Sequence, residues 1–449
     1  MTEHFRLSNG IARVAIAATG AAFLGLSAPA AQAQQLSFWY QSSTPAHETI
    51  LKQQIEVCAA QQPGVSVRPE SVGLDVMYPR IAAALRDRKP PNVINTVESV
   101  VAFLQSRKSL APVDDVIDAH GRADFIPAFL NTVKAEGKTW AIPDWALHHA
   151  VWYRKDMFAE AGIQKMPTNW AELQAAAEKL TKDKDGDGKP DQFGFAVPWG
   201  AKFFAAQQSL FDALYAQGIT VADAKTGAYA FGAKKAEATA ALDYMMQMHK
   251  RYSPPASIDW TLIEIRSALM NGQIAAGAEW GGVVKFVEQQ RPEMLDKLGV
   301  FPLPGRDGPA KASLGGGFFH MIGAGPANEV AASKKLVGCL MQPAEVAKRS
   351  NSRAIFALPA INSAYETEAF KSDPIIKRFA PEIETIRRDV IANWHRYGLE
   401  AGLNPVSSIM ESTSVINESM QKVALGKQTA QQAIDELDVF MKQSFEQRQ

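Results

Sequence analysis

Short apolar runs alternate with longer amphipathic stretches in the part of the chain that follows residue 33. The runs at 35–40, 65–70 and 90–97 are rich in β-branched and aromatic residues, which favours β-strands. Apolar residues in 47–61 and 76–88 recur at steps of three and four, the spacing of amphipathic helices. Strands that alternate with helices predict an α/β domain with a largely parallel sheet.

The middle and the end of the chain have a different pattern. From about 157 to 299 the apolar spacing is mostly helical, interrupted by a short apolar strand in "IAAGAEWGGV". "VFPLPG" and "SLGGGFFHMIGAG" predict further strands, and the remainder is helical up to a last helix at 429–448. We find no internal repeat at a solenoid period.

The first 33 residues form a separate segment. Arg6 and Arg13 give it a basic start, and 14–30 is apolar but short for a membrane span. "AQA" at 31–33 is the small-x-small pattern that signal peptidase cleaves, so we predict a signal peptide over 1–33 and a mature chain from Gln34. The alternative is an N-terminal anchor helix, which the length disfavours. No cysteine lies near the cleavage point to carry a lipid, so we expect a soluble periplasmic protein.

Composition narrows the function classes. The 449 residues suffice for two domains, and Lys+Arg and Asp+Glu both number 47, so no net charge attracts nucleic acid. Cys58 and Cys339 are compatible with one disulfide or with two buried thiols, and the sequence does not decide between them. No metalloprotease, nucleophile-elbow or phosphate-loop motif occurs, so we expect no enzyme. The two catalytic carboxylates of a glycosidase are not marked by a motif of this kind. A secreted carbohydrate-active enzyme therefore stays as an alternative.

Several segments match one family in order and spacing. They are "LSFWYQSS", "KPPNVINTVESVVAFLQSRKSLAPVDDVID", "GKTWAIPDWALHHAVWYRKDMFAEAGI", "MPTNWAELQAAAEKLTK", "IAAGAEWGG", "LGGGFFHMIG", "NEVAASKKLVGCLMQPAEV" and "ALGKQTAQQAIDEL". In this order the chain resembles the extracellular solute-binding proteins of ABC importers, in the group with maltose-type and glycerol-phosphate-type receptors. Asn92 and Arg154 depart from the family's Asp and Asn.

The resemblance implies a two-lobed periplasmic-binding-protein fold of the α/β class, with a hinge between the lobes and the ligand cleft at that hinge. Lobe one would comprise 34–142 plus 313–360, and lobe two 146–308 plus 365–449. Closure of the cleft would be a motion of whole lobes.

Aromatic residues near strand ends suggest a carbohydrate ligand, because an aromatic face covers the C–H patches of a sugar ring. Among the nine tryptophans, Trp280 precedes two glycines, at a position where the resemblance places a stacking aromatic. Trp199 lies in a Pro–Trp–Gly loop, and Trp145 follows the expected crossover at Pro143. Trp170 begins an amphipathic helix and is better explained as core.

Polar groups at the ends of the first and third strands, in the crossover and in the triple glycine complete the candidate site. The predicted ligand-binding set is Tyr40, Gln41, Ser42, Tyr78, Thr96, Glu98, Asp144, Trp145, His148, Trp199, Lys202, Phe203, Trp280, Gly316, Gly317 and Arg353. The alternative for Arg353 is a surface ion pair. The alternative for Tyr78 is a helix cap, and the alternative for the glycines is a tight turn. Lys202 and Arg353 also leave open glycerol phosphate or another anion as the ligand.

The acidic segment "DKDGDGKPD" is close to a calcium-binding loop. Counting from Asp183, the candidate ligands are Asp183, Asp185, Asp187, Lys189 and Asp191, with Gly188 at the sixth position. The twelfth position is Gly194 instead of a bidentate carboxylate, and "FGFAV" predicts a strand instead of a second helix. We therefore expect a helix-to-strand turn, with structural calcium as an alternative and no cofactor required.

The sequence therefore predicts a monomeric solute-binding protein that takes a sugar, short oligosaccharide or polyol and delivers it to the membrane permease of an ABC transporter.

Overall fold

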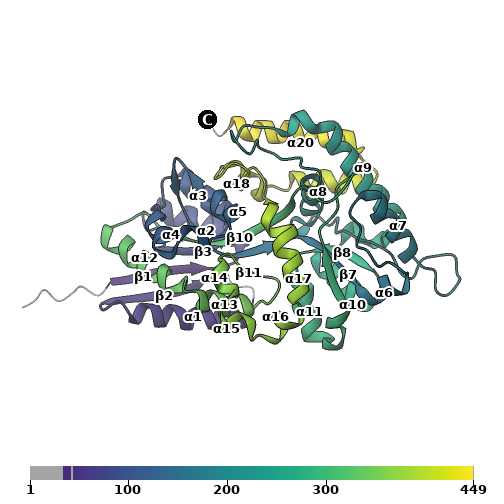
Figure 1. The fold of residues 1–449 in the computed structure, drawn as a ribbon. Helices are drawn as coiled ribbons and strands as arrows, with labels where there is room; N and C mark the ends of the chain where they lie inside the picture. Colours follow the sequence, from purple (N-terminus) through teal and green to yellow (C-terminus); the bar gives the residue numbers. More distant parts are fainter. Residues whose placement is uncertain (1–33, 42–43, 448–449) are drawn as a thin grey trace, which may run out of the picture.

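The structure, a computed structural model, describes residues 34–41 and 44–447 (Figure 1). The segment predicted to be a signal peptide lies outside them. The described chain forms two lobes, each with its own sheet and helices. We use lobe one for the part built on the large sheet and lobe two for the part built on the small sheet.

The large sheet has the strand order β11-β6-β10-β3-β1-β2, with β12 pairing β10. Its strands are β1 (Gln34–Tyr40), β2 (Val65–Ser71), β3 (Val93–Val97), β6 (Ile142–His148), β10 (Ser313–Ile322), β11 (Leu358–Pro359) and β12 (Trp394–His395). β1 is parallel to β2 and β3, as the alternating pattern predicts. β10 is antiparallel to both β3 and β6, so the sheet is mixed.

The small sheet is antiparallel, in the order β8-β7-β9. Its strands are β7 (Ala150–Arg154), β8 (Ala276–Glu279) and β9 (Leu298–Phe301), and β4 (Lys134–Ala135) and β5 (Lys138–Thr139) form a separate hairpin. The strand predicted at 193–197 is reduced to isolated bridges, Phe193 with Ile274 and Ala196 with Gly277. The prediction of a regular strand was therefore wrong, because the segment pairs with its neighbours at only two points.

Helices cover both sheets. Those of the first part of the chain are α1 (Pro45–Ala60), α2 (Leu74–Arg86), α3 (Glu98–Ser106), α4 (Asp114–His120) and α5 (Pro127–Thr132). The helical middle comprises α6 (Lys155–Glu160), α7 (Trp170–Leu180), α8 (Ala205–Ala216), α9 (Lys235–Tyr252), α10 (Leu262–Asn271) and α11 (Gly282–Gln290). The last part contains α12 (Ala327–Leu340), α13 (Pro343–Asn351), α14 (Asn362–Tyr365), α15 (Glu368–Lys371), α16 (Pro374–Arg378), α17 (Ala380–Thr385), α18 (Val406–Ser412), α19 (Val415–Ala424) and α20 (Ala430–Glu446).

Local sequence explains where these elements begin. In β1 every second residue from Leu36 to Tyr40 is buried, the period of a strand with one covered face. α1 begins where the Thr44 side chain accepts a hydrogen bond from the His47 N–H, with Pro45 in the first turn. Pro69 is tolerated in β2 because β2 is an edge strand.

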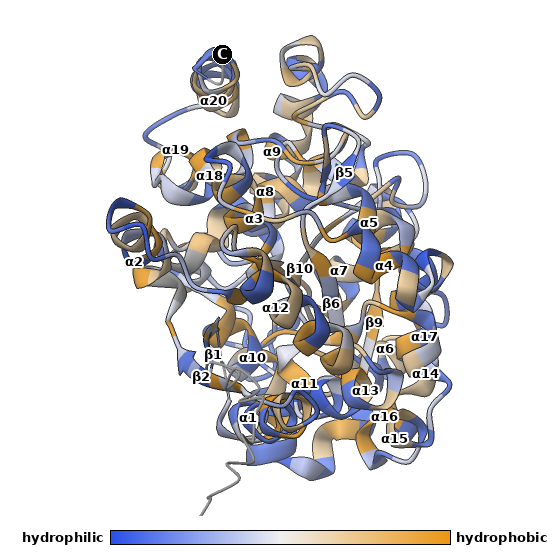
Figure 2. Cartoon of the chain, turned by 90° about the vertical axis from the view of Figure 1, so that its left-hand side faces the viewer, coloured by the Kyte–Doolittle hydropathy of each residue, from blue (hydrophilic) through white to orange (hydrophobic). Residues whose placement is uncertain are grey.

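Surface helices show hydrophilic and hydrophobic residues side by side (Figure 2). α19 is an example, because Ile416, Met420 and Val423 are buried while Glu418 and Gln421 lie outside that set. The apolar face of such a helix is covered by the core beneath it. In the described part of the chain no helix has the length and apolar character needed to cross a membrane.

Two hydrophobic clusters fill the described chain. The first fills lobe one and continues into lobe two under Trp152 of β7, Leu269 of α10 and Val284 of α11, and the second fills most of the rest of lobe two. Leu147 and Phe356 pack against both clusters. β6 stays in the large sheet up to His148 and β7 begins in the small sheet at Ala150, so the chain crosses at His149 instead of at Pro143. In Figure 1 β1 to β3 lie on one side of β10, and β7 and β8 lie on the other. The lobe boundaries given above stay a prediction.

A disulfide joins Cys58 of α1 to Cys339 of α12 across a sequence separation of 281 residues. This settles the alternative that the sequence left open. α1 and α12 are neighbours on lobe one, so the bond ties two helices of a single lobe.

We expect the double variant Cys58→Ser/Cys339→Ser to unfold at lower urea concentration than the native protein, with a loss of about 2–5 kcal/mol in the free energy of unfolding. The cause is the larger conformational freedom of the unfolded chain without the cross-link. Reductant should lower the stability of the native protein and leave that of the serine variant unchanged. Equal stability of both proteins under oxidising conditions would contradict this.

Candidate ligand-binding site

Several candidate residues converge where the carboxyl ends of β1 and β3 face lobe two. Tyr40 ends β1, and Glu98 follows β3 directly as the first residue of α3. Phe318 of β10 lies opposite Val97, the last residue of β3. The earlier part of β10 therefore extends past the end of β3 towards lobe two. We call this place, with Glu98, Gly315–Gly317, Trp280 and Arg396, the junction.

An ionic cluster bridges the lobes at the junction. Arg396 Nε lies 2.8 Å from Glu98 Oε1 of lobe one and 2.8 Å from Glu411 Oε1 of α18. Arg396 precedes Tyr397, which belongs to the core of lobe two, and its guanidinium lies 4.5 Å from the centroid of that ring. One arginine thus lies between two carboxylates, at the point where the chain passes from β12 of the large sheet to the core of lobe two.

Burial determines the protonation of Glu98. Its side chain is fully buried, and burial raises its pKa from 4.5 to about 7, although Arg396 acts in the opposite direction. Glu98 Oε2 also accepts a hydrogen bond from the Gly317 N–H at 2.9 Å. The N–H of Gly317, one of the predicted ligand-binding residues, is therefore engaged by Glu98 in this structure.

The triple glycine permits close packing around β10. A Cβ on Gly315 would lie 2.7 Å from Cβ of Trp394, and one on Gly317 would lie 2.9 Å from the Phe129 ring. A Cβ on Gly316 would meet Glu98 Oε1 at 3.5 Å, so Gly316 presents bare backbone to the ionic cluster.

Trp280 provides the aromatic surface of the junction on the side of lobe two. It follows β8, and its Nε1 donates to Gln208 Oε1 at 2.9 Å, which fixes the ring. The edge of His149 meets it with centroids 5.0 Å apart, and the Arg396 guanidinium lies 5.8 Å from its centroid. The sequence-predicted pair of Trp280 and Glu98 is therefore brought to one place.

Asp144 belongs to a buried network inside lobe one. Its Oδ1 accepts from Arg349 Nη2 at 2.6 Å, and its Oδ2 lies 3.1 Å from Asn95 Nδ2 and 3.3 Å from His320 Nε2. Burial alone would raise the pKa of Asp144, but Arg349 and His320 hold it well below its usual range. Both carboxylate oxygens are thus occupied within lobe one.

Arg353, His47 and Trp145 form a second buried group. The Arg353 guanidinium lies 4.4 Å from the centroid of the Trp145 ring, and its Nη2 contacts His47 Nδ1. Trp145 in turn stacks on Phe318 with centroids 4.0 Å apart. The sequence suggested a surface ion pair as one alternative for Arg353, but its side chain is 2% exposed.

The other predicted residues lie around these groups or apart from them. Thr96 is buried and donates to Gln41 Oε1 at 3.0 Å, and Tyr78 donates to Ser99 Oγ at 2.8 Å. His148 is fully buried next to Trp152. Trp199 lies within the core of lobe two, its ring edge against His249.

For three more candidates the structure gives less detail. Lys202 is exposed at the start of the 3₁₀ turn Lys202–Phe204, which also contains the backbone of Phe203. Ser42 lies outside the described residues. The ligand role of every predicted residue stays a prediction.

Sequence reasoning missed the partners of the predicted residues. Arg396 and Glu411 are about 300 residues from Glu98 along the chain, so no local pattern joins them. "NWHRYG", where an arginine stands between aromatic residues, was the available signal for Arg396. Gln208 and His47 carried no signal, because each lies in an ordinary helix.

The acidic loop after α7 gathers three of its five candidate ligands. Carboxylate oxygens of Asp183, Asp185 and Asp187 lie within 4.8 Å of one another, and all three residues are exposed. Asp191 is used differently: its Oδ2 accepts from the Lys184 and Asp185 N–H groups. Lys189 offers its backbone N–H to Asp187.

Hydrogen bonds within the chain already order this loop. Asp183 accepts from the N–H groups of Gly188 and Gly186, which lower its pKa. A bridge between Lys182 and Gln192 closes the loop, and the chain continues without a second helix. The turn expected at this position is present, and calcium stays a prediction.

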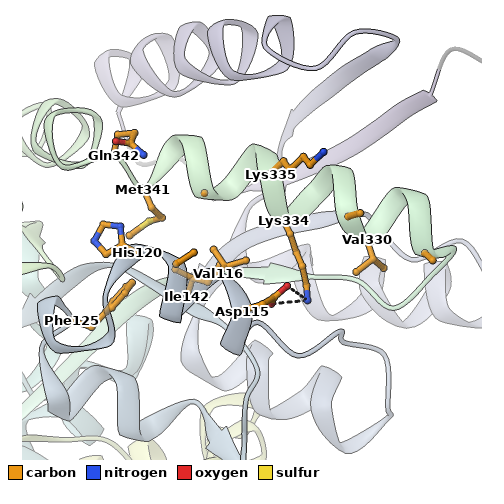
Figure 3. A pocket seen from close by; sticks show the side chains of 14 residues that line it. Asp115, Val116, His120, Phe125, Ile142, Val330, Lys334, Lys335, Met341 and Gln342 are labelled. Atoms are coloured by element: carbon orange, nitrogen blue, oxygen red, sulfur yellow. Dashed lines mark hydrogen bonds and ion pairs between the residues drawn. The ribbon is translucent and has the colours of Figure 1, made fainter. Parts of the chain in front are cut away.

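A pocket of about 610 Å³ lies away from the junction, between α4 and α12 of lobe one (Figure 3). Val116 and Val330 line it, and Lys334 Nζ pairs with Asp115 Oδ1 at 2.8 Å beside it. Its walls all come from lobe one, so relative motion of the lobes leaves its shape unchanged. We therefore do not assign it to the solute.

Comparison with known proteins decides the family. The model of the family described as bacterial extracellular solute-binding protein matches residues 53–378, well over half of the chain. The chain belongs to this family. Its family and its fold are those of binding proteins, as the resemblance implied.

Individual relatives are distant. A candidate ABC transporter periplasmic-binding protein of Escherichia coli, YcjN, is 23% identical over 90% of this solute-binding protein and 92% of its own length. A candidate binding protein of Brucella abortus is 29% identical over 35% of the chain, and the match spans only 38% of that relative.

Solved structures show the same fold. The sugar-binding protein MalE of Xanthomonas citri matches with a TM-score of 0.74 at 20% identity, over 92% of this chain and 98% of its own. A solute-binding protein of Thermotoga lettingae matches with a TM-score of 0.72 at 20% identity, over 92% and 100%. These likenesses confirm the two-lobed fold.

We expect the stability of the protein to fall by up to about 3 kcal/mol between pH 4.5 and pH 7 through Glu98 alone. The folded-state pKa of about 7 lies above the unfolded value near 4.5, so folding favours the protonated carboxyl and this contribution is lost as the pH rises. Urea unfolding at pH 5, 6, 7 and 8 measures it. The glutamine in Glu98→Gln does not titrate. The difference in unfolding free energy between the native protein and this variant should therefore change by that amount across the pH range. Parallel pH profiles would exclude a raised pKa for Glu98.

Calcium binding by the acidic loop is tested by melting the EDTA-treated protein with and without added Ca²⁺. A bound ion links Asp183, Asp185 and Asp187 and should raise Tm by several degrees at saturating concentration. Asp187→Asn should remove this rise, whereas Asp223→Asn, at another exposed turn, should keep it. An unchanged Tm in the native protein would exclude calcium as a structural ion.

Proposed function

We propose that this chain is the periplasmic solute-binding protein of an ABC importer. It binds a sugar, a short oligosaccharide or a polyol between its lobes and delivers it to the membrane permease. It acts as a monomer after removal of the signal peptide and does no chemistry on the solute.

The observation that carries this proposal is the composition of the junction. The Trp280 ring is fixed by Gln208, and the carboxylates of Glu98 and Glu411 together with the Arg396 guanidinium lie beside it. An aromatic face covers the C–H side of a sugar ring, and planar charged groups bind its hydroxyls. Both kinds of group lie at the boundary between the lobes, where closure can enclose a solute.

Closure requires contacts that form when the lobes meet. The Glu98–Arg396 pair lies where the chain passes between the lobes, and α18 packs against α3, so both are candidates for such contacts. A solute that bridges the same groups stabilises the closed state relative to the open one, which shifts the population. The permease then distinguishes the loaded protein by its shape.

The similar proteins support the solute class. The Thermotoga lettingae structure has bound α-D-tagatose, and a Thermotoga maritima MalE3 has bound maltose. A further neighbour binds mannobiose and mannotriose, and a relative in Pseudomonas aeruginosa is a mannitol-binding protein. These solutes range from one monosaccharide and one polyol to a trisaccharide, so they support a class of solutes and select no member of it.

We expect isothermal calorimetry against a panel of hexoses, pentoses, maltose- and mannose-type oligosaccharides, hexitols and their acidic counterparts to identify a solute. Trp280→Ala should weaken its binding by about 2 kcal/mol, roughly thirtyfold in Kd, because the stacking surface is lost. Trp170→Ala is the matched control: Trp170 stacks on Tyr244 in the same lobe, 4.2 Å between centroids, and should leave Kd unchanged.

Absence of binding to every sugar, polyol and acidic counterpart would overturn the proposed solute class. A turnover assay on the bound solute separates a receptor from a carbohydrate-active enzyme, because a receptor releases it unchanged.

A further inference from the structure

The buried group of Arg353, His47 and Trp145 is rich in donors and poor in acceptors. Each of these side chains is at most 2% exposed. Arg353 Nε and Nη1, Trp145 Nε1 and His47 Nε2 have no hydrogen-bond partner among the described residues. Buried polar groups are normally paired, so four such atoms in one group require an explanation.

The tautomer of His47 follows from its neighbour. Guanidinium nitrogen only donates, so His47 Nδ1 accepts from Arg353 Nη2 and His47 Nε2 carries the hydrogen. Burial, followed by the charge of Arg353, lowers the pKa of His47 to about 2, so the imidazole is neutral. The four free atoms are therefore all N–H donors around a single positive charge.

A comparison within the same lobe shows what this charge lacks. Arg349 is also 2% exposed, but its guanidinium pairs with Asp144 and donates to Gln54 and the Leu340 carbonyl. Within the described part of the chain, Arg353 makes no such ion pair with a carboxylate. The negative charge of Asp144 acts on Arg353, but the Asp144 oxygens are engaged by Arg349, Asn95 and His320. A buried unpaired charge is costly, whereas a paired one is tolerated.

The position of Arg353 connects it to the opening between the lobes. Ile355, two residues on, has a φ of +72°, a strained conformation for a β-branched residue. Its carbonyl oxygen lies near Gly281 of lobe two, 3.2 Å from where a Cβ on that glycine would be. Phe356 packs against both hydrophobic clusters, and its ring lies 6.2 Å from that of Trp145. The segment that carries Arg353 therefore reaches lobe two within two residues, so Arg353 lies next to the boundary between the lobes.

We propose that Arg353, with the N–H groups of His47 and Trp145, binds an oxyanion of the transported solute. The solute is then an acidic carbohydrate: a sugar acid with a carboxylate, or a sugar or polyol phosphate. This inference rests on the proposed function and narrows its solute class. The negative group enters from the open cleft and supplies the acceptor that Arg353 lacks. The Trp145 ring covers one face of the guanidinium and leaves its edge for the oxyanion.

Calorimetry on the full-length processed protein with matched pairs tests this. The carboxylate arm compares glucuronate, galacturonate and gluconate with glucose, galactose and sorbitol. The phosphate arm compares glucose 6-phosphate and glycerol 3-phosphate with glucose and glycerol. We expect the acidic member of at least one pair to bind at least tenfold more tightly than its neutral partner, and the arm in which this occurs identifies the oxyanion.

Variants connect that preference to Arg353. Arg353→Gln should weaken binding of the acidic solute by about 10- to 150-fold, and Arg353→Lys should retain the charge and part of the affinity. The control is Arg107→Gln, since Arg107 also lies over an aromatic ring of lobe one, Phe103 at 3.7 Å, but on the surface. It should leave both affinities unchanged. Circular dichroism and thermal melting confirm that each variant is folded, and the acid-to-neutral ratio of the native protein decides the question if Arg353→Gln does not fold.

The outcomes separate the two proposals. Tight binding of a neutral solute with no preference for its acidic counterpart overturns the oxyanion site and leaves the proposed function intact. An acidic preference that survives in folded Arg353→Gln also overturns it. Absence of binding to any neutral or acidic member overturns the proposed function and this inference with it.

Discussion

The position of β10 in the middle of the large sheet is the constraint on which the junction depends. All ten of its residues are buried, and it pairs with β3 and β6 while its first two residues also pair with β12. A strand enclosed in this way can approach Trp394, Glu98 and Phe129 only if the facing residues lack side chains, and Gly315 to Gly317 meet that condition. The same absence of side chains leaves room for Arg396 to reach Glu98 and the Gly315 carbonyl.

Three arginines near this strand, two buried and one mostly buried, have different electrostatic roles. Arg349 is matched to Asp144 within lobe one, so that pair contributes to a rigid lobe. Arg396 is shared between two carboxylates of different elements, so its pairing depends on how the lobes meet. Arg353 has an aromatic ring and a neutral imidazole as neighbours. The degree of pairing thus differs among the three arginines, from an ion pair within one lobe to a guanidinium without a carboxylate partner.

Local sequence was sufficient for most of the architecture. Alternating burial in β1, the Thr44 and Pro45 start of α1 and the helical spacing of the middle region are all encoded within a few residues of where they act. The segment at 193–197 has strand-like residues but pairs at only two points, and that extent of pairing is set by the tertiary fold and not by the local pattern. The location of Glu98 and Trp280 at the ends of strands could be predicted, because each follows an apolar run of strand-like residues. Arg396 and Glu411 could not, since they reach the junction through the short strand β12 and the helix α18, whose placement depends on the tertiary fold.

The Cys58–Cys339 bond has a topological consequence. Both cysteines lie in lobe one, and the chain between them leaves that lobe, builds β7, β8, β9 and the helices α6 to α11, and returns. Most of lobe two is therefore an excursion within a covalent ring that is closed on lobe one. A peptide bond broken anywhere in that excursion, for example in the exposed loop after α7, leaves the two pieces attached to each other, so the oxidised protein remains one molecule after a single cut.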